Sequence, residues 1–145
     1  MSARLTVRPQ APAALTESDL AALQRLRQTA AALRVWADVA QADNDAADEV
    51  GSLQVLAAGL LMTIEDAEEA LEGALRCVEH GPWRLGVIHA GCMVGQLDMA
   101  LWARLENATD LPTPVRCDLA STARLAAYLL DAWLDRVLKA LGVSA

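Results

Sequence analysis

The sequence predicts an all-α fold, an up-down-up-down antiparallel four-helix bundle with a flexible N-terminal arm. Its composition favours helix, since 30 Ala and 24 Leu stand against one Tyr and no Phe, and unbranched side chains lose little rotamer freedom in a helix. Apolar residues recur at steps of three and four in three segments, as on the buried face of a helix, and a fourth segment is apolar nearly all round. Short connectors separate these segments, and short connectors make consecutive helices antiparallel neighbours.

The chain divides into an arm over residues 1–14 and a single domain over residues 15–145. The arm contains two prolines and shows no sustained hydrophobic period. The first helix is predicted to begin after Thr16, whose side chain forms a capping box with Asp19, and to end near Ala42. Its predicted buried stripe is Leu23, Leu26, Ala30, Leu33, Ala37 and Ala40.

The second helix has the most regular pattern in the chain. Its predicted seam consists of Val50, Leu53, Ala57, Leu60, Ile64, Ala67, Leu71, Ala74 and Val78. A seam of this kind is typical of left-handed helical bundles. Gly81 and Pro82 are expected to separate this helix from the next one, which gives it about 34 residues and a length of about 50 Å.

The third helix, expected over about residues 83–107, is apolar nearly all round between Leu85 and Gly95. A helix without a polar face is either central or covered by another subunit. Small side chains on this helix would let a second backbone approach closely. The residues predicted to make this helix-packing or oligomer contact are Gly86, Ala90, Gly91 and Gly95.

The fourth helix follows a connector that contains two prolines. Thr113 is the expected N-cap, and Pro114 suits the first helical position. Apolar side chains again recur on one face of this helix. The predicted buried residues are Leu119, Ala123, Ala126, Leu130, Trp133, Val137 and Leu141.

Charge is distributed very unevenly along the chain. Val35 to Leu75 carries ten carboxylates and no Lys or Arg, whereas the other 104 residues carry nine acids and twelve bases. The net charge of −7 is therefore a local −10 offset by +3 elsewhere. Five of the acids fall off the seam of the second helix and form its predicted outer face. These predicted partner-binding residues are Glu65, Asp66, Glu68, Glu69 and Glu72.

An acidic face of this kind suits a protein partner with a basic surface, and it is equally consistent with simple solubility. Nucleic acid is not an expected partner, because the Arg residues are scattered rather than gathered in a basic stripe. A membrane is not expected either, because the longest apolar run, Leu85 to Gly95, is much shorter than the ~20 residues that span a bilayer. The three cysteines lie in or beside apolar helical patterns, which favours reduced thiols and a cytoplasmic location.

Two metal sites are alternatives to this interpretation. Cys77, His80, His89 and Cys92 flank the expected turn between the second and third helices, so a tetrahedral zinc site is conceivable. The helix phase disfavours it, because it places His80 toward solvent. An acidic Mg²⁺ site within residues 65–72 would need a matching acidic pair on a neighbouring helix, which the sequence lacks.

No catalytic residue and no cofactor is predicted. Cys77 with His80 as base would be a thiol nucleophile, but no residue is placed by spacing to orient the imidazole. The expected function is therefore that of a non-enzymatic helical-bundle protein acting by protein–protein interaction: a small regulator, inhibitor, immunity protein or adaptor. The acidic face of the second helix is its expected binding surface, and a second copy of the chain is a further candidate partner.

Overall fold

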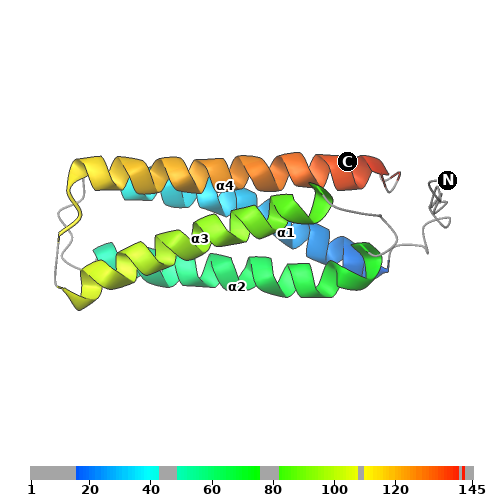
Figure 1. The fold of residues 1–145 in the computed structure, drawn as a ribbon, viewed down its shortest axis with the longest axis horizontal. Coiled ribbons are helices and arrows are strands. Elements are labelled where there is room, and N and C mark those ends of the chain that lie inside the picture. Colours follow the sequence, from blue (N-terminus) through cyan, green and yellow to red (C-terminus); the bar gives the residue numbers. More distant parts are fainter. Residues whose placement is uncertain (1–15, 43–48, 76–81, 108–109, 141, 143–145) are drawn as a thin grey trace, which may run out of the picture.

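The structure is a computed structural model that describes residues 16–42, 49–75, 82–107, 110–140 and 142. Its helices are α1 (Glu17–Gln41), α2 (Glu49–Leu75), α3 (Pro82–Glu106) and α4 (Thr113–Ala140). Successive helices run in opposite directions along one long axis (Figure 1). The predicted all-α, up-down-up-down four-helix bundle is thus confirmed. The predicted arm and the end of the second helix beyond Leu75 lie outside the described residues.

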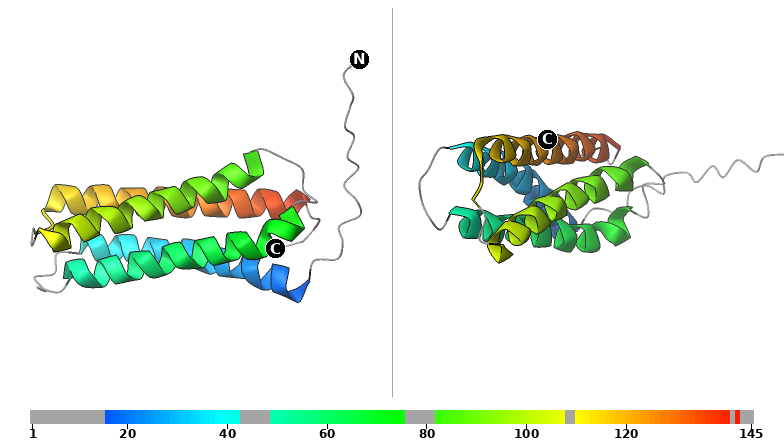
Figure 2. Two further views of the ribbon diagram at one scale, coloured as in Figure 1. Left: turned by 60° about the horizontal axis from the view of Figure 1, so that its bottom comes forward. Right: turned by 60° about the vertical axis from the view of Figure 1, so that its left-hand side comes forward.

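Each helix occupies one corner of the bundle. α1 packs against α2 and α4, and α3 packs against the same two helices, whereas diagonally opposite helices make no contact within the described ranges (Figure 2). Of the two expected positions of the third helix, central or covered by another subunit, the central one is therefore wrong. Ile88, His89 and Cys92 are exposed on its outer side, because the apolar run is longer than the one stripe that a corner helix buries.

Capping contacts explain where α1 begins and ends. The Asp19 N–H donates to the Thr16 side chain at 3.1 Å, and the Thr16 N–H donates to the Asp19 carboxylate at 3.0 Å. This reciprocal pair confirms the predicted capping box. At the other end, the Arg116 guanidinium donates to the carbonyl oxygen of Ala42 at 2.9 Å, which satisfies a backbone acceptor just past α1.

The core consists almost entirely of Leu, Ala, Val and Ile, as the spacing predicts. All six residues of the predicted stripe on α1 are buried, and so are the predicted residues of α4 except Leu141, which lies outside the described ranges. On α2, the seam residues Val50 and Leu60 are half-buried, and those from Leu53 to Leu71 are otherwise buried. Two indoles complete the core, those of Trp36 and Trp133.

Candidate functional site

The carboxylates that face the α1–α4 side of the bundle have Arg partners. Arg27 donates to Asp131 at 2.8 Å and to Asp135 at 2.7 Å, and Arg34 also donates to Asp131. Arg124 pairs with Asp38 at 2.9 Å and donates to the Gln41 side chain. Asp38 is the first carboxylate of the predicted acidic stretch, so this stretch begins with a carboxylate that is already paired with an arginine.

The Arg27–Asp131 network also shifts the pKa values of Asp131 and Arg27. Burial acts to raise the pKa of Asp131, but hydrogen bonds from Arg34 and Arg27 outweigh it, so this pKa lies below its ordinary value. The hydrogen bonds that Arg27 donates to Asp135 and Asp131 raise the pKa of Arg27. These groups hold two helices together and present little unmatched charge to a partner.

The carboxylates of α2 are in a different situation. Glu65, Asp66 and Glu69 are exposed, and Glu68 is half-buried. Among the described residues, no Lys or Arg forms an ion pair with any of these four. The side chain of Glu72, the fifth predicted partner-binding residue, is outside the described part of the structure. The α2 face thus carries at least four unmatched negative charges within about one and a half helical turns.

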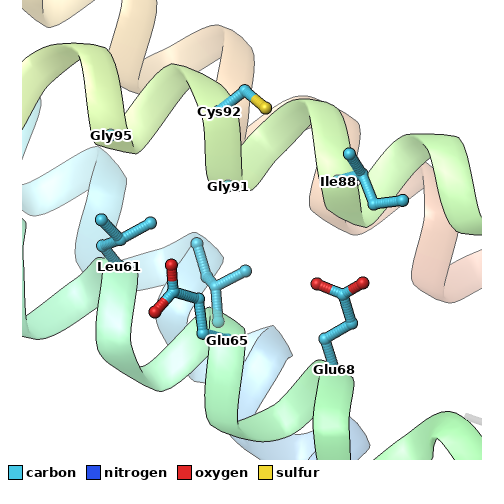
Figure 3. A pocket seen from close by; sticks show the side chains of 8 residues that line it. Leu61, Glu65, Glu68, Ile88, Gly91, Cys92 and Gly95 are labelled. Carbon is cyan, nitrogen blue, oxygen red and sulfur yellow. The ribbon is translucent and has the colours of Figure 1, made fainter.

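Two of these carboxylates stand at a groove between α2 and α3. The groove has a volume of about 330 Å³ and an open side toward solvent. In Figure 3, Glu65 and Glu68 project from α2 toward α3, while Ile88 projects from α3 beside them. Cys92 and two glycines complete the α3 wall. The residues that line the groove are Leu61, Ile64, Glu65, Glu68, Ile88, Gly91, Cys92 and Gly95.

The four small residues of α3 do not share one role. A Cβ atom on Gly91 would lie 3.6 Å from Ile64, and one on Gly95 would lie 3.9 Å from Leu61, so these two glycines face α2 inside the groove. Ala90 is buried in the core. Gly86 instead faces α4. Contact of these residues with another subunit stays a prediction.

Exposed apolar side chains continue along the same side of the molecule. Val55 and Met62 on α2 are 65% and 62% exposed, and Met99 and Trp102 on α3 are 72% and 53% exposed. The Gln54 side chain donates to Asp98 at 2.7 Å, so the two helices are in register where these residues lie. Exposed apolar side chains also occur on the other side of the bundle, among them Val35 on α1 and Tyr128 on α4, so the acidic groove beside the apolar patch is what distinguishes the α2–α3 side.

The structure describes only two of the four residues that were considered as zinc ligands. Cys77 and His80 lie outside them. His89 and Cys92 are exposed on the outer face of α3. Within the described part of the chain, no group of three or more His, Cys, Asp or Glu side chains is arranged to hold a metal ion. The zinc and Mg²⁺ alternatives therefore gain no support from the described residues.

One described helix, α2, contains a stretch that is long and apolar enough by length and composition to cross a membrane, over Val50–Leu71. Core helices of soluble proteins pass the same test, and α2 packs against α1 and α3. The stretch also includes the four carboxylates of residues 65–69, and a charged side chain costs about 2.5–3.5 kcal/mol at the centre of a bilayer. The arrangement is compatible with a soluble bundle.

Sequence periodicity placed the carboxylates outside the seam but missed the groove itself. Ile88 carried no special signal, because it is one apolar residue in an apolar run. Gly91 and Gly95 did carry a signal, since small residues four apart allow close approach. Which neighbouring helix they meet depends on the rotation of α3, which an apolar helix does not reveal. Comparison with known proteins finds no relative of this chain: no protein-family model, no curated protein and no solved structure matches it.

Proposed function

We propose that this chain is a non-enzymatic helical-bundle protein that acts by binding another protein, as a small regulator, inhibitor, immunity protein or adaptor. Its binding surface is the acidic face of α2 together with the adjoining groove, and its partner has a basic surface. One observation carries the proposal: Asp131, Asp135 and Asp38 are paired with Arg, whereas Glu65 and its acidic neighbours on α2 have no described cation.

The neighbourhood of these carboxylates favours binding over simple solubility. A face that serves only solubility carries interspersed charges of both signs and few large apolar side chains. The α2–α3 side instead has unmatched acids next to Val55, Met62, Met99 and Trp102. Interfaces combine an apolar centre, often aromatic, with charges that steer the encounter. The exposed free thiols Cys92 and Cys117 accord with a reducing compartment, so we place the protein in the cytoplasm.

Co-purification from the native host at low salt tests this proposal. The bait is the full chain, compared with a variant that carries Glu65→Gln, Asp66→Asn, Glu68→Gln and Glu69→Gln. We expect a protein with a basic surface to be retained by the native chain and at least tenfold less by the variant, because four steering charges are lost. Quantitative mass spectrometry of the retained proteins measures both.

A matched control removes the same number of charges elsewhere. Exposed carboxylates of the other helices and connectors are replaced, namely Glu17→Gln, Glu106→Gln, Asp110→Asn and Asp118→Asn. This control should retain the partner like the native chain. Equal retention by both variants, or no specifically retained protein at all, would contradict the proposal.

A further inference from the structure

We propose that the groove between α2 and α3 is also a docking site for this chain's own N-terminal segment. In this arrangement residues 4–8 bind in an extended form, with Arg4 and Arg8 on the α2 carboxylates. The inference goes beyond the proposed function, because it concerns the isolated chain and holds whether or not a separate partner binds.

The sequence of the N-terminal segment fits a groove with one acidic wall and one apolar wall. It reads Arg4-Leu5-Thr6-Val7-Arg8. In an extended chain successive side chains point to opposite sides, so Arg4 and Arg8 share one edge with Thr6, while Leu5 and Val7 share the other. The segment thus has one basic edge and one apolar edge.

The groove offers the complementary pair of surfaces. Its α2 wall carries Glu65 and Glu68, and its floor and α3 wall carry Leu61, Ile64 and Ile88. Figure 3 shows the carboxylates on one side of the gap and Ile88 on the other. A guanidinium forms strong charge-assisted hydrogen bonds with a carboxylate. Since no described cation pairs with Glu65 or Glu68, these acceptors are open to Arg4 and Arg8.

The groove lies within reach of the segment. The indole of Trp36 donates to the carbonyl oxygen of Leu53, which sets the register of antiparallel α1 and α2 and places the start of α1 near the end of α2. Figures 1 and 2 show these two ends at the same end of the bundle. Glu68 is therefore about 7.5 Å along the axis from the level of Thr16, and about two helix spacings of 8–10 Å sideways.

The connecting chain is long enough for that path. The straight-line distance is about 20 Å, and the eight residues from Arg8 to Leu15 span about 26 Å when extended. Arg8 therefore reaches the nearer carboxylate, Glu68. Arg4 lies about 13 Å from Arg8 in an extended segment, whereas Glu65 lies about 5 Å from Glu68, so the long arginine side chains have to converge to pair with both carboxylates. A basic partner would have to displace this segment, so docking in cis would weaken partner binding and select for partners that are more basic or more apolar than residues 4–8.

Cys92 provides a reporter in the native chain, because it lines the groove, while Cys117 on α4 is exposed elsewhere. The test measures alkylation rates of both thiols with iodoacetamide, site by site, by mass spectrometry. We compare the native chain with Arg4→Gln/Arg8→Gln and with the charge-matched control Arg25→Gln/Arg136→Gln. We expect Cys92 to react about tenfold faster in the first variant only, which corresponds to about 1.4 kcal/mol of docking free energy.

A second pair of substitutions makes the assignment specific. Glu65→Gln/Glu68→Gln should raise the alkylation rate of Cys92 by the same factor. Combining this variant with Arg4→Gln/Arg8→Gln should raise the rate no further, because both pairs of substitutions remove the same contact. Cys117, which is exposed in the folded chain, should react at one rate throughout, and circular dichroism of each variant should show the native helix content. These measurements use no partner, so their failure leaves the proposed function standing, and failure of partner capture leaves the docking proposal standing.

Two results would overturn the docking proposal. One is a Cys92 rate in the native chain equal to that in Arg4→Gln/Arg8→Gln. The other is protection of Cys92 that persists in that variant and grows with protein concentration, which would identify a second copy of the chain as the occupant of the groove.

Discussion

The indole of Trp133 sets how closely α3 and α4 approach. A Cβ atom added to Gly86 would lie 2.8 Å from Cδ1 and 2.9 Å from Cβ of Trp133. The Cβ atom is fixed to the backbone of α4, so it cannot rotate away, and only a glycine fits opposite it. The Trp133 Nε1 is buried, and it has no hydrogen-bond partner among the residues that the structure describes.

Gly86→Ala is therefore expected to destabilise the protein by about 1–3 kcal/mol, because α3 must move away from α4. Urea unfolding followed by circular dichroism measures the change. The matched control is Gly59→Ala on α2, where nothing lies within 4 Å of the added Cβ. That control should stabilise by about 0.5–1 kcal/mol, since a glycine inside a helix costs conformational entropy. Equal effects of the two substitutions would contradict the packing account.

Trp36 shows what the sequence could and could not predict at this scale. Its position next to the buried stripe of α1 is visible in the sequence, but its hydrogen bond to the Leu53 carbonyl is not. That bond depends on the rotation and register of two helices that are separated by a connector. The same limit applies to Arg27 and Asp131, which the hydrophobic period places outside the core but does not pair.

At the scale of elements, ion pairs join α1 to α4, whereas no ion pair joins the described side chains of α2 to those of α3. Asp131 accepts hydrogen bonds from both Arg27 and Arg34, and its side chain is only 22% exposed. Its pKa is lower in the folded chain than in the unfolded chain, because the folded chain stabilises the charged form. Asp131 thus contributes stability above its unfolded pKa of about 4, and this contribution is lost as the pH falls through the folded pKa.

Asp131→Asn is expected to destabilise the protein by about 1 kcal/mol at pH 7, since solvent around the half-exposed Arg partners weakens the pairs. Below about pH 4 the native chain should lose this advantage, so the two unfolding free energies should converge. Urea unfolding across pH 3 to 7 measures this. Asp118→Asn, an exposed site on the same helix, should follow the native pH profile. A constant difference between native chain and Asp131→Asn at all pH values would contradict the assignment.

The helices themselves were largely predictable, because α1, α2 and α4 each have a regular stripe, α3 is a long apolar run, and the start of α1 has an identifiable capping box. The α2–α3 groove was not predictable in the same way. Its acidic wall follows from the phase of α2, which has a clear seam. Its α3 wall required a structure, because the run from Leu85 to Gly95 is apolar on every side and fixes no rotation.

At the scale of the whole molecule, matched and unmatched charges lie on two different sides, while exposed apolar side chains occur on both, including Val35 on α1 and Tyr128 on α4. The α1–α4 side carries matched ion pairs, and the α2–α3 side carries unmatched carboxylates beside exposed Met99 and Trp102. Unmatched surface charge acts over about 10 Å at 0.1 M salt and is screened above that concentration. A partner that uses the α2–α3 side should therefore associate in a salt-sensitive way, with the apolar patch adding a contribution that salt does not remove.

The most direct test of this account is the affinity of the captured partner for the native chain, measured by calorimetry at about 50 mM and about 500 mM salt. We expect the dissociation constant to rise at least tenfold with salt for the native chain, and much less for the variant that lacks the charges of Glu65, Asp66, Glu68 and Glu69. A dissociation constant that is unchanged by salt, or that changes equally in both proteins, would contradict the assignment of the acidic face of α2 as the binding surface.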